Sequence, residues 1–376
     1  MAIIFASLYK VPTIYTKIMF IRITLLFLIV SIFSSAASAQ SRIPNFAPKH
    51  YICYQSEAPL QIDGKLDEAS WEKAPWTDEF IDIEGEHMPK PRFATRAKML
   101  WDSQYLYIAA DMEEPHVWGT LTERDAVIFY DNDFEVFIDP DGDSHFYYEF
   151  EMNALNTIWD LMLTAPYRDD RNVVLNSWDI RGIKTAVNVR GTLNNPEDED
   201  QGWSVEIAMP WKVLKEKSAT GKMPGNGEYW RINFSRVEWQ TEVVDDNYKK
   251  KINPETNKSY PEDNWVWTAQ SYINMHRPET WGFLVFDTAI VGEGDASFSI
   301  PESEYIKWEL RKVYYRQNDY FREHGKYAHE VKELGMSESK YTIEMVAGET
   351  FYNATICQTG NICWQINEKG RVDRSK

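Results

Sequence analysis

Hydrophobic and polar residues alternate along much of the chain between residues 50 and 288. Period-two alternation places successive side chains on opposite faces of a strand, and it is typical of half-buried β-strands. The clearest alternating runs are 97–101, 105–110, 133–139, 146–152, 184–189, 203–208, 229–234 and 281–286. Turn-forming clusters of Asp, Asn, Pro and Gly separate them. Residues 45–288 are therefore expected to form an all-β, two-sheet antiparallel β-sandwich.

Three segments within this region depart from the strand pattern. Residues 67–73 and 210–215 are expected to form short helices. Residues 241–262 are polar and charged and contain two prolines, which favours a long surface loop.

The hydrophobic pattern changes after the glycine-containing spacer 291–295. From Pro301 to Leu334 apolar residues recur at helical spacing, with an interruption near Gly325. Strand-like runs follow at 341–346 and 355–366. Residues 300–376 are therefore expected to form a small α+β appendage. Because it can bury little core alone, we expect it to pack on the sandwich or to depend on a disulfide.

The first 39 residues are predicted to be a secretory signal peptide. An apolar run of 11 residues, Ile23–Phe33, follows basic residues and precedes small residues that end at Ala39. Such a run is too short for a stable membrane span. We expect cleavage after Ala39, a secreted or periplasmic bacterial location, and no membrane span in the mature chain. The long leading segment leaves Met1 and Met19 both open as the initiator.

Charge and aromatic content narrow the range of partners. The formal net charge is −18, and removing residues 1–39, which hold three cations and no acids, makes it −21. This acidity argues against nucleic acids and anionic membrane surfaces as partners. Aromatic residues make up 14% of the chain, with 15 Trp. The expected ligands are neutral or cationic.

The three cysteines have separate expected roles. Cys357 and Cys363 bracket a turn-like stretch and are expected to form a disulfide in an oxidising compartment. Cys53 is expected to be a buried thiol. The spacing of His and Cys residues does not favour a structural zinc site.

Five segments in the sandwich region resemble the family 9 carbohydrate-binding modules that accompany secreted xylanases. These segments are 62–71, 99–111, 132–140, 202–211 and 274–282. The resemblance implies a β-sandwich that binds oligo- or polysaccharides and holds structural calcium. Sugar rings have apolar faces that stack on aromatic side chains, while their hydroxyls need polar partners.

The resemblance also implies a clamp of two Trp around the sugar. The corresponding positions here hold Phe129 and Met275. Either the ligand differs or nearby aromatics substitute, and the candidates are Trp159, Trp178, Trp239 and Trp267. Trp71, Trp101, Trp203, Trp211 and Trp281 are expected in the core. Trp118, Trp159, Trp178, Trp239, Trp265 and Trp267 are the candidates for exposed platforms.

Carboxylates alternate with apolar residues on two neighbouring predicted strands. Glu135 and Asp139 share one face of their strand, and Glu149, Glu151 and Asn153 share a face of the next. These side chains fit three alternatives: a solvated outer face, contacts to sugar hydroxyls, or an acid–base pair for hydrolysis.

Two further motifs contain candidate metal-binding or ligand-binding residues. Asp139, Asp141 and Asp143 surround a glycine turn, which fits either a plain acidic hairpin or a calcium site. His276 and Arg277 precede Trp281 and fit either a structural corner or a ligand contact.

Three functions remain open. The leading one is a secreted, non-catalytic carbohydrate-binding protein that takes part in polysaccharide capture or catabolism. The second is a glycoside hydrolase acting on O-glycosyl bonds with acids among Glu135, Asp139, Glu149 and Glu151. The third is an envelope interaction protein with a degenerate sugar site, whose residues 300–376 bind a protein partner.

Overall fold

The computed structural model describes residues 43–358, 360 and 362–375. The predicted signal peptide lies outside the described residues. None of the described helices has the length and apolar character needed to cross a membrane.

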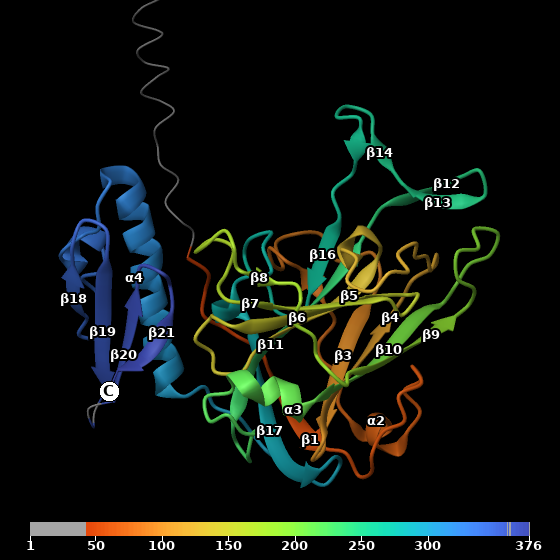
Figure 1. Cartoon of the computed structure of the whole chain (residues 1–376), viewed down its shortest axis with the longest axis horizontal. Helices are drawn as coiled ribbons and strands as arrows, with labels where there is room; N and C mark the ends of the chain where they lie inside the picture. Colours follow the sequence, from red (N-terminus) through yellow and green to blue (C-terminus); the bar gives the residue numbers. More distant parts are fainter. Residues whose placement is uncertain (1–42, 359, 361, 376) are drawn as a thin grey trace, which may run out of the picture.

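A single 13-stranded sheet forms the body of the molecule (Figure 1). Its main path runs β8-β7-β6-β5-β11-β17-β1-β3-β4-β10-β9, and β16 and β2 extend it beside β11. The strands are β1 (His50–Gln55), β2 (Ile81–Asp82), β3 (Thr95–Trp101), β4 (Tyr105–Met112), β5 (Asp133–Asp139), β6 (Tyr147–Asn153), β7 (Ile158–Leu163), β8 (Val174–Leu175), β9 (Lys184–Arg190), β10 (Gly202–Pro210), β11 (Tyr229–Glu238), β16 (Asp263–Val266) and β17 (Gly282–Ile290).

The sheet folds over itself and forms a β-sandwich. Inward residues of β5, such as Val136 and Ile138, share one core with Val205 and Ile207 of β10. This packing confirms the predicted fold class. One detail differs, because β1 runs parallel to both β17 and β3. It lies between these two strands on the path.

The short elements agree with the expected positions except in one segment. Short helices form at α2 (Ala69–Lys73) and α3 (Trp211–Leu214), followed by η2 (Lys215–Lys217). The segment 241–262, predicted to be a long surface loop, is at the surface but contains strands. The segment forms two exposed hairpins, β12 (Thr241–Val244) with β13 (Asn247–Lys250) and β14 (Ile252–Asn253) with β15 (Lys258–Ser259). Asp245 and Asp246 both have positive φ, as a two-residue hairpin turn of type I′ requires.

The C-terminal appendage consists of a long helix and a four-stranded sheet. Helix α4 (Glu302–His324) ends at Gly325, whose φ of 70° is the left-handed conformation of a helix C-cap. A 3₁₀ turn, η4 (Val331–Leu334), precedes the sheet β18 (Glu344–Ala347), β19 (Tyr352–Gln358), β20 (Ile362–Asn367) and β21 (Val372–Ser375). A disulfide between Cys357 and Cys363 joins β19 to β20. Strand β21 had no counterpart in the sequence prediction.

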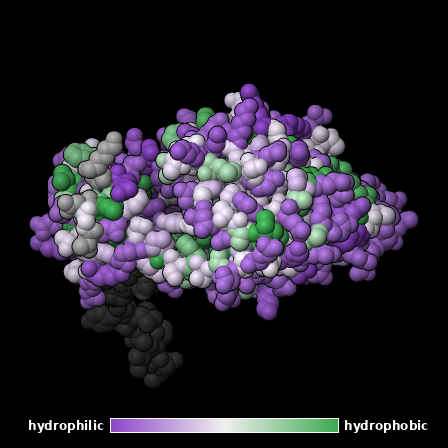
Figure 2. Space-filling model, turned by 90° about the horizontal axis from the view of Figure 1, so that it is seen from below, coloured by the Kyte–Doolittle hydropathy of each residue, from purple (hydrophilic) through white to green (hydrophobic). Residues whose placement is uncertain are grey.

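Buried ionic contacts hold α4 against the sandwich. Arg231 on β11 donates to Glu304 Oε2 at 2.7 Å, and Lys307 lies 2.9 Å from Oε1 of the same carboxylate. Burial alone would raise the pKa of Glu304, but the two cations lower it to about 2. Phe46 stacks on Trp308 with ring centroids 5.2 Å apart. The appendage is thus packed on the sandwich. In Figure 2, hydrophilic residues dominate the face in view, with only small hydrophobic patches.

Candidate functional site

A pocket of about 320 Å³ lies on the outer face of β5, β6 and β7. Glu135, Glu149 and Glu151 line it together with aromatic side chains and residues of the segment 273–276. Strand alternation explains why the acids meet here. Phe134 and Val136 point into the sandwich core, so Glu135 points outward, where it lies directly opposite Glu151.

The outer face that carries these acids is covered rather than solvated. Glu135, Glu149 and Glu151 are only 5%, 5% and 2% exposed. The covering layer is an apolar cluster that includes Ile83, Met275 and Trp281. The solvated-face alternative for these carboxylates is therefore wrong, because segments distant in sequence close over the strands.

Aromatic rings form the walls of the pocket. Phe129 belongs to the 3₁₀ turn η1 (Ile128–Tyr130), and Trp159 on β7 lies opposite Glu151 on β6. His276 packs edge-on against Tyr167, with ring centroids 4.4 Å apart. Burial, with a smaller contribution from Arg168, lowers the pKa of His276 to about 3, so its ring is neutral at physiological pH. The walls present flat apolar faces beside hydrogen-bonding groups.

Burial and mutual repulsion raise the pKa values of the carboxyl groups in and beside the pocket. Burial raises the pKa of Glu135 to about 7. Burial, followed by the charge of Glu135, raises the pKa of Glu149 to about 8. The pKa values of Glu151 and Asp133 are raised well above their ordinary range, first by burial and then by neighbouring carboxylates.

Replacing Glu149 by Gln is expected to make stability less dependent on pH. A carboxyl whose folded pKa exceeds its unfolded pKa stabilises the fold below the unfolded value and loses this contribution as pH rises through the folded value. For Glu149 the window runs from about pH 4.5 to about pH 8. Within it, wild type should lose about 1.4 kcal/mol per pH unit relative to Glu149→Gln. Urea unfolding of both proteins in metal-free buffer at pH 5 and pH 8 measures this difference, and a pH-independent difference would contradict it.

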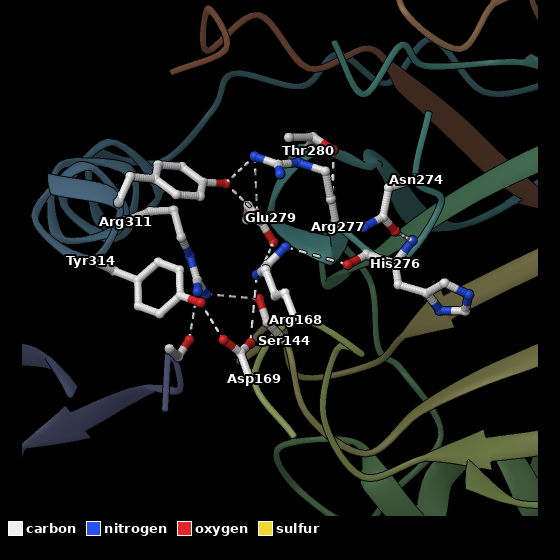
Figure 3. A network of polar contacts seen from close by, with 12 residues as sticks. Ser144, Arg168, Asp169, Asn274, His276, Arg277, Glu279, Thr280, Arg311 and Tyr314 are labelled. Carbon is white, nitrogen blue, oxygen red and sulfur yellow. Dashed lines mark hydrogen bonds and ion pairs between the residues drawn. The ribbon is translucent and has the colours of Figure 1, made fainter. Parts of the chain in front are cut away.

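The segment 273–280, whose first four residues line the pocket, is hydrogen-bonded to the C-terminal appendage (Figure 3). Residues 278–280 form the 3₁₀ turn η3 (Pro278–Thr280), and the buried Glu279 accepts from Arg168 at 2.9 Å. Arg168 also donates to the backbone oxygen of His276 at 3.3 Å. Tyr315 of α4 donates to Glu279 and accepts from Arg277 at 2.7 Å. Arg168, Arg277 and Arg311 surround Glu279 and are called the arginine cluster. Figure 3 shows the ring of His276 pointing away from this cluster.

The structure brings half of the predicted ligand-binding residues into one place. Phe129, Glu135, Glu151, Trp159 and His276 line the pocket. The other predicted residues lie elsewhere: Asn153, Trp178, Trp239, Trp267 and Arg277.

Asn153, Trp178 and Arg277 have structural contacts outside the pocket. Asn153 is buried and donates to the Leu121 oxygen at 2.9 Å and to Asp131 at 3.0 Å. Trp178 stacks on Tyr148 at 4.7 Å, and Tyr148 belongs to the sandwich core on the opposite face of β6. Arg277 belongs to the arginine cluster described above.

Four tryptophans expected as exposed platforms are buried: Trp118, Trp239, Trp265 and Trp267. Trp239 donates to the Phe129 oxygen at 2.8 Å, and the Lys250 ammonium lies 3.3 Å from its ring centroid. Trp267 packs on Gly282, where an added Cβ would come within 2.5 Å of the indole. Trp239 directly precedes the exposed hairpins, and the other three stand beside polar residues of loops or of β16, so local polarity misrepresented their burial. The five tryptophans expected in the core are all buried, as predicted.

Glu149, which strand alternation places on the same face as Glu151, lines the pocket as one of the acids considered from the sequence. Other pocket residues were missed. Tyr167, Asn264 and Asn274 carried no comparable signal, because each reaches the pocket only through long-range packing.

The acidic turn at the end of β5 has its own partners. Carboxylate oxygens of Asp139, Asp141 and Asp143 lie within 4.8 Å of one another. Asp139 accepts from the backbone amides of Gly142 and Ser144, and Asp143 pairs with Arg371 at 2.9 Å. Calcium at this turn stays a prediction, and an ion there would compete with Arg371.

The sequence profile of one protein family, described as "Carbohydrate family 9 binding domain-like", matches residues 62–287. The chain belongs to this family. The match spans every strand of the sandwich except β1 and the end of β17, and it includes the whole pocket. Phe129 and Met275, the two positions at which the sequence resemblance implies the clamp, both line that pocket.

Individual relatives are more distant. Exoglucanase XynX of Acetivibrio thermocellus is 26% identical over 154 residues, which are 41% of this chain and 12% of that protein. The chain thus spans only a small part of that relative. A family 9 module from Caldicellulosiruptor kristjanssonii, solved with cellotriose, is 15% identical, with a TM-score of 0.41, and the comparison covers 67% of this chain and 100% of the module. A family 9 module from Caldicellulosiruptor kristjanssonii solved with glucose is 15% identical, with a TM-score of 0.40. That comparison covers 66% of this chain and 100% of the module.

Proposed function

We propose that the pocket on the outer face of β5–β7 binds carbohydrate. The observation that carries this proposal is the convergence of aromatic and polar groups in a member of a carbohydrate-binding family. Phe129, Trp159 and Tyr167 supply flat apolar faces, and Asn264 and Asn274 supply amides. A volume of about 320 Å³ is at the small end of ligand pockets, roughly 300–1,000 Å³. The site therefore suits one or two sugar rings.

We further infer that the protein acts outside the cytoplasm in polysaccharide capture, without catalysing bond cleavage itself. The expected signal peptide and the disulfide between Cys357 and Cys363 support an oxidising location. An envelope protein partner for residues 300–376 stays a prediction.

Glycan binding by the mature full chain tests the proposed function. Cellotriose, which is bound in one of the similar structures, is a suitable first probe, followed by a panel of plant and microbial glycans. Binding should change the tryptophan emission, because Trp159 lines the pocket. Emission that stays constant with every glycan at millimolar concentration would contradict the proposal.

One observation favours hydrolysis of glycosidic bonds as a second candidate. Glu135 and Glu149 face one pocket, and their pKa values of about 7 and about 8 would let a proton be exchanged near neutral pH. Asp139, the fourth acid considered from the sequence, does not line this pocket. Turnover of aryl glycosides that disappears in Glu135→Gln would support hydrolysis, and turnover unchanged in both Glu135→Gln and Glu149→Gln would exclude these acids.

A further inference from the structure

A second cavity lies between the sandwich and the C-terminal appendage. Its volume is about 460 Å³, against about 320 Å³ for the pocket of β5–β7. Seven of its eleven lining residues belong to α4 and the segments that follow it. These seven lie outside the region that matches the family, residues 62–287, so the family match does not account for the cavity.

Three arginines line this cavity: Arg168, Arg277 and Arg322. Two of them are held in fixed positions. Arg168 is hydrogen-bonded within the arginine cluster described above. Arg277 donates to Tyr315 at 2.7 Å, and its guanidinium carbon lies 4.3 Å from the ring centroid of Tyr272. A fixed, planar guanidinium group suits a carboxylate, which it can bind with two parallel hydrogen bonds.

The arginine cluster beside the cavity lacks acceptors for all of its N–H groups. Its three Nε atoms are buried and have no hydrogen-bond partner in the described part of the chain, and Arg168 Nε has only an ion-pair contact with Asp169 at 3.5 Å. Burial alone would raise the pKa of Glu279, but the three arginines hold it well below its ordinary value, so they share this one charged carboxylate. Asp169 and Glu368 are the acids among the lining residues, against three arginines. The cavity is therefore locally cationic, although the chain has a net charge of −18.

Aromatic rings and an amide complete the cavity. Tyr272 and Phe321 line it and are half-buried, so part of each ring faces open space. Phe321 packs on Tyr327, with ring centroids 4.7 Å apart. Asn318 supplies an amide that can both donate and accept. Apolar ring surfaces beside hydrogen-bonding groups are the combination that recognises a sugar ring.

The cavity is a direct neighbour of the pocket of β5–β7. Tyr167 lines the pocket, and the next residue, Arg168, lines the cavity. Residues 273–276 line the pocket, whereas Tyr272 and Arg277 on either side of them line the cavity. The same two segments of backbone thus separate the two sites.

We propose that this cavity binds a sugar ring that carries a carboxylate, as in the hexuronic acid residues of acidic polysaccharides. The guanidinium groups bind the carboxylate, the rings of Tyr272 and Phe321 contact the apolar faces of the sugar, and Asn318 contacts its hydroxyls. A carboxylate carries one negative charge, which matches the excess of one arginine over the acids that line the cavity. The preference for an anion comes from the arginines, and only the choice of a sugar as its carrier rests on the proposed function.

Titration of the ¹⁵N-labelled mature chain with sodium glucuronate or galacturonate at constant ionic strength tests the proposal. Because the Nε protons of the arginine cluster are buried, their NMR signals should be protected from exchange. The signals of Arg168 and Arg277 should shift with millimolar hexuronate and much less with glucose or acetate at the same concentration. Equal shifts with acetate would indicate a simple anion site and overturn the proposal. No shift with either hexuronate would overturn it too.

Arg322→Ala should weaken hexuronate binding by roughly threefold, because it removes one cation from the wall of the cavity. The Arg322 side chain is 58% exposed, so this variant should remain folded, which circular dichroism checks. Lys326→Ala is the matched control, since it removes an exposed cation of the same region that does not line the cavity. Equal losses of affinity in the two variants would mean a general effect of charge and would overturn the proposal.

Trp159→Ala separates this proposal from the proposed function. It alters the pocket of β5–β7 and should leave hexuronate binding unchanged. Hexuronate binding that is lost in Trp159→Ala and retained in Arg322→Ala would place this ligand in the pocket and overturn the proposal. Binding of neutral glycans in the pocket without any response to hexuronates would overturn only this proposal and leave the proposed function intact.

Discussion

Glu279→Ala is expected to destabilise the protein by about 3–5 kcal/mol, because it leaves buried guanidinium groups without their common partner. Glu279 is 8% exposed and lies 2.9 Å from Arg168 and 3.9 Å from Arg277. Burial alone would raise the pKa of Glu279, but Arg168, Arg311 and Arg277 hold it well below its ordinary value. The carboxylate is therefore charged in the fold, and its contribution is lost only below about pH 4.5.

Urea unfolding at pH 7, followed by circular dichroism, measures this loss. Lys332→Ala is the matched control, because Lys332 and Glu330 form an exposed ion pair. Such surface pairs contribute little to the free energy of unfolding. A change below about 1 kcal/mol for Glu279→Ala would show that the arginine cluster does not depend on this carboxylate.

Trp159→Ala is expected to weaken glycan binding by at least roughly tenfold. Aromatic side chains at the centre of a binding site commonly contribute about 2 kcal/mol or more, and 1.4 kcal/mol corresponds to tenfold in affinity. Trp159 is half-buried and lines the pocket opposite Glu151, so its removal opens one wall without emptying the sandwich core. Trp159→Phe keeps an aromatic face and should retain much of the affinity.

Isothermal titration with the glycan that binds wild type most tightly gives the comparison. Trp364→Ala is the control, since Trp364 is a half-buried tryptophan of the appendage and lies outside the pocket. Equal losses of glycan affinity in both variants would mean that the effect is not specific to the pocket. An unchanged affinity in Trp159→Ala would show that Trp159 does not contact the glycan.

Local patterns predicted the elements of the fold well. Period-two alternation identified eight strands of the main sheet, namely β3–β6, β9–β11 and β17, but not β1, β2, β7, β8 or β16. It also identified the shared face of Glu135 and Asp139, and helical spacing with Gly325 identified the limits of α4. These features depend on residues close in sequence. The parallel pairing of β1 with β17 was missed because it joins residues that are more than two hundred positions apart.

The site was only partly predictable for the same reason. Glu135 was identified from strand alternation, Phe129 from the family resemblance and Trp159 as a substitute for the missing clamp, and all three line one pocket. Whether an aromatic residue is exposed depends on what covers it. Trp239 and Trp267 follow or adjoin polar segments, yet other parts of the sandwich bury both. The cover over Glu151 likewise comes from loops far from β6.

The central claim is that the pocket of β5–β7 binds carbohydrate, and an indole nitrogen–proton NMR spectrum tests it most directly. Titration of the ¹⁵N-labelled mature chain with a glycan should move the Trp159 signal, assigned from Trp159→Phe. The core indoles of Trp71, Trp101 and Trp203 should keep their positions. Glycan-dependent shifts confined to other tryptophans, or no shift with any glycan, would contradict the account.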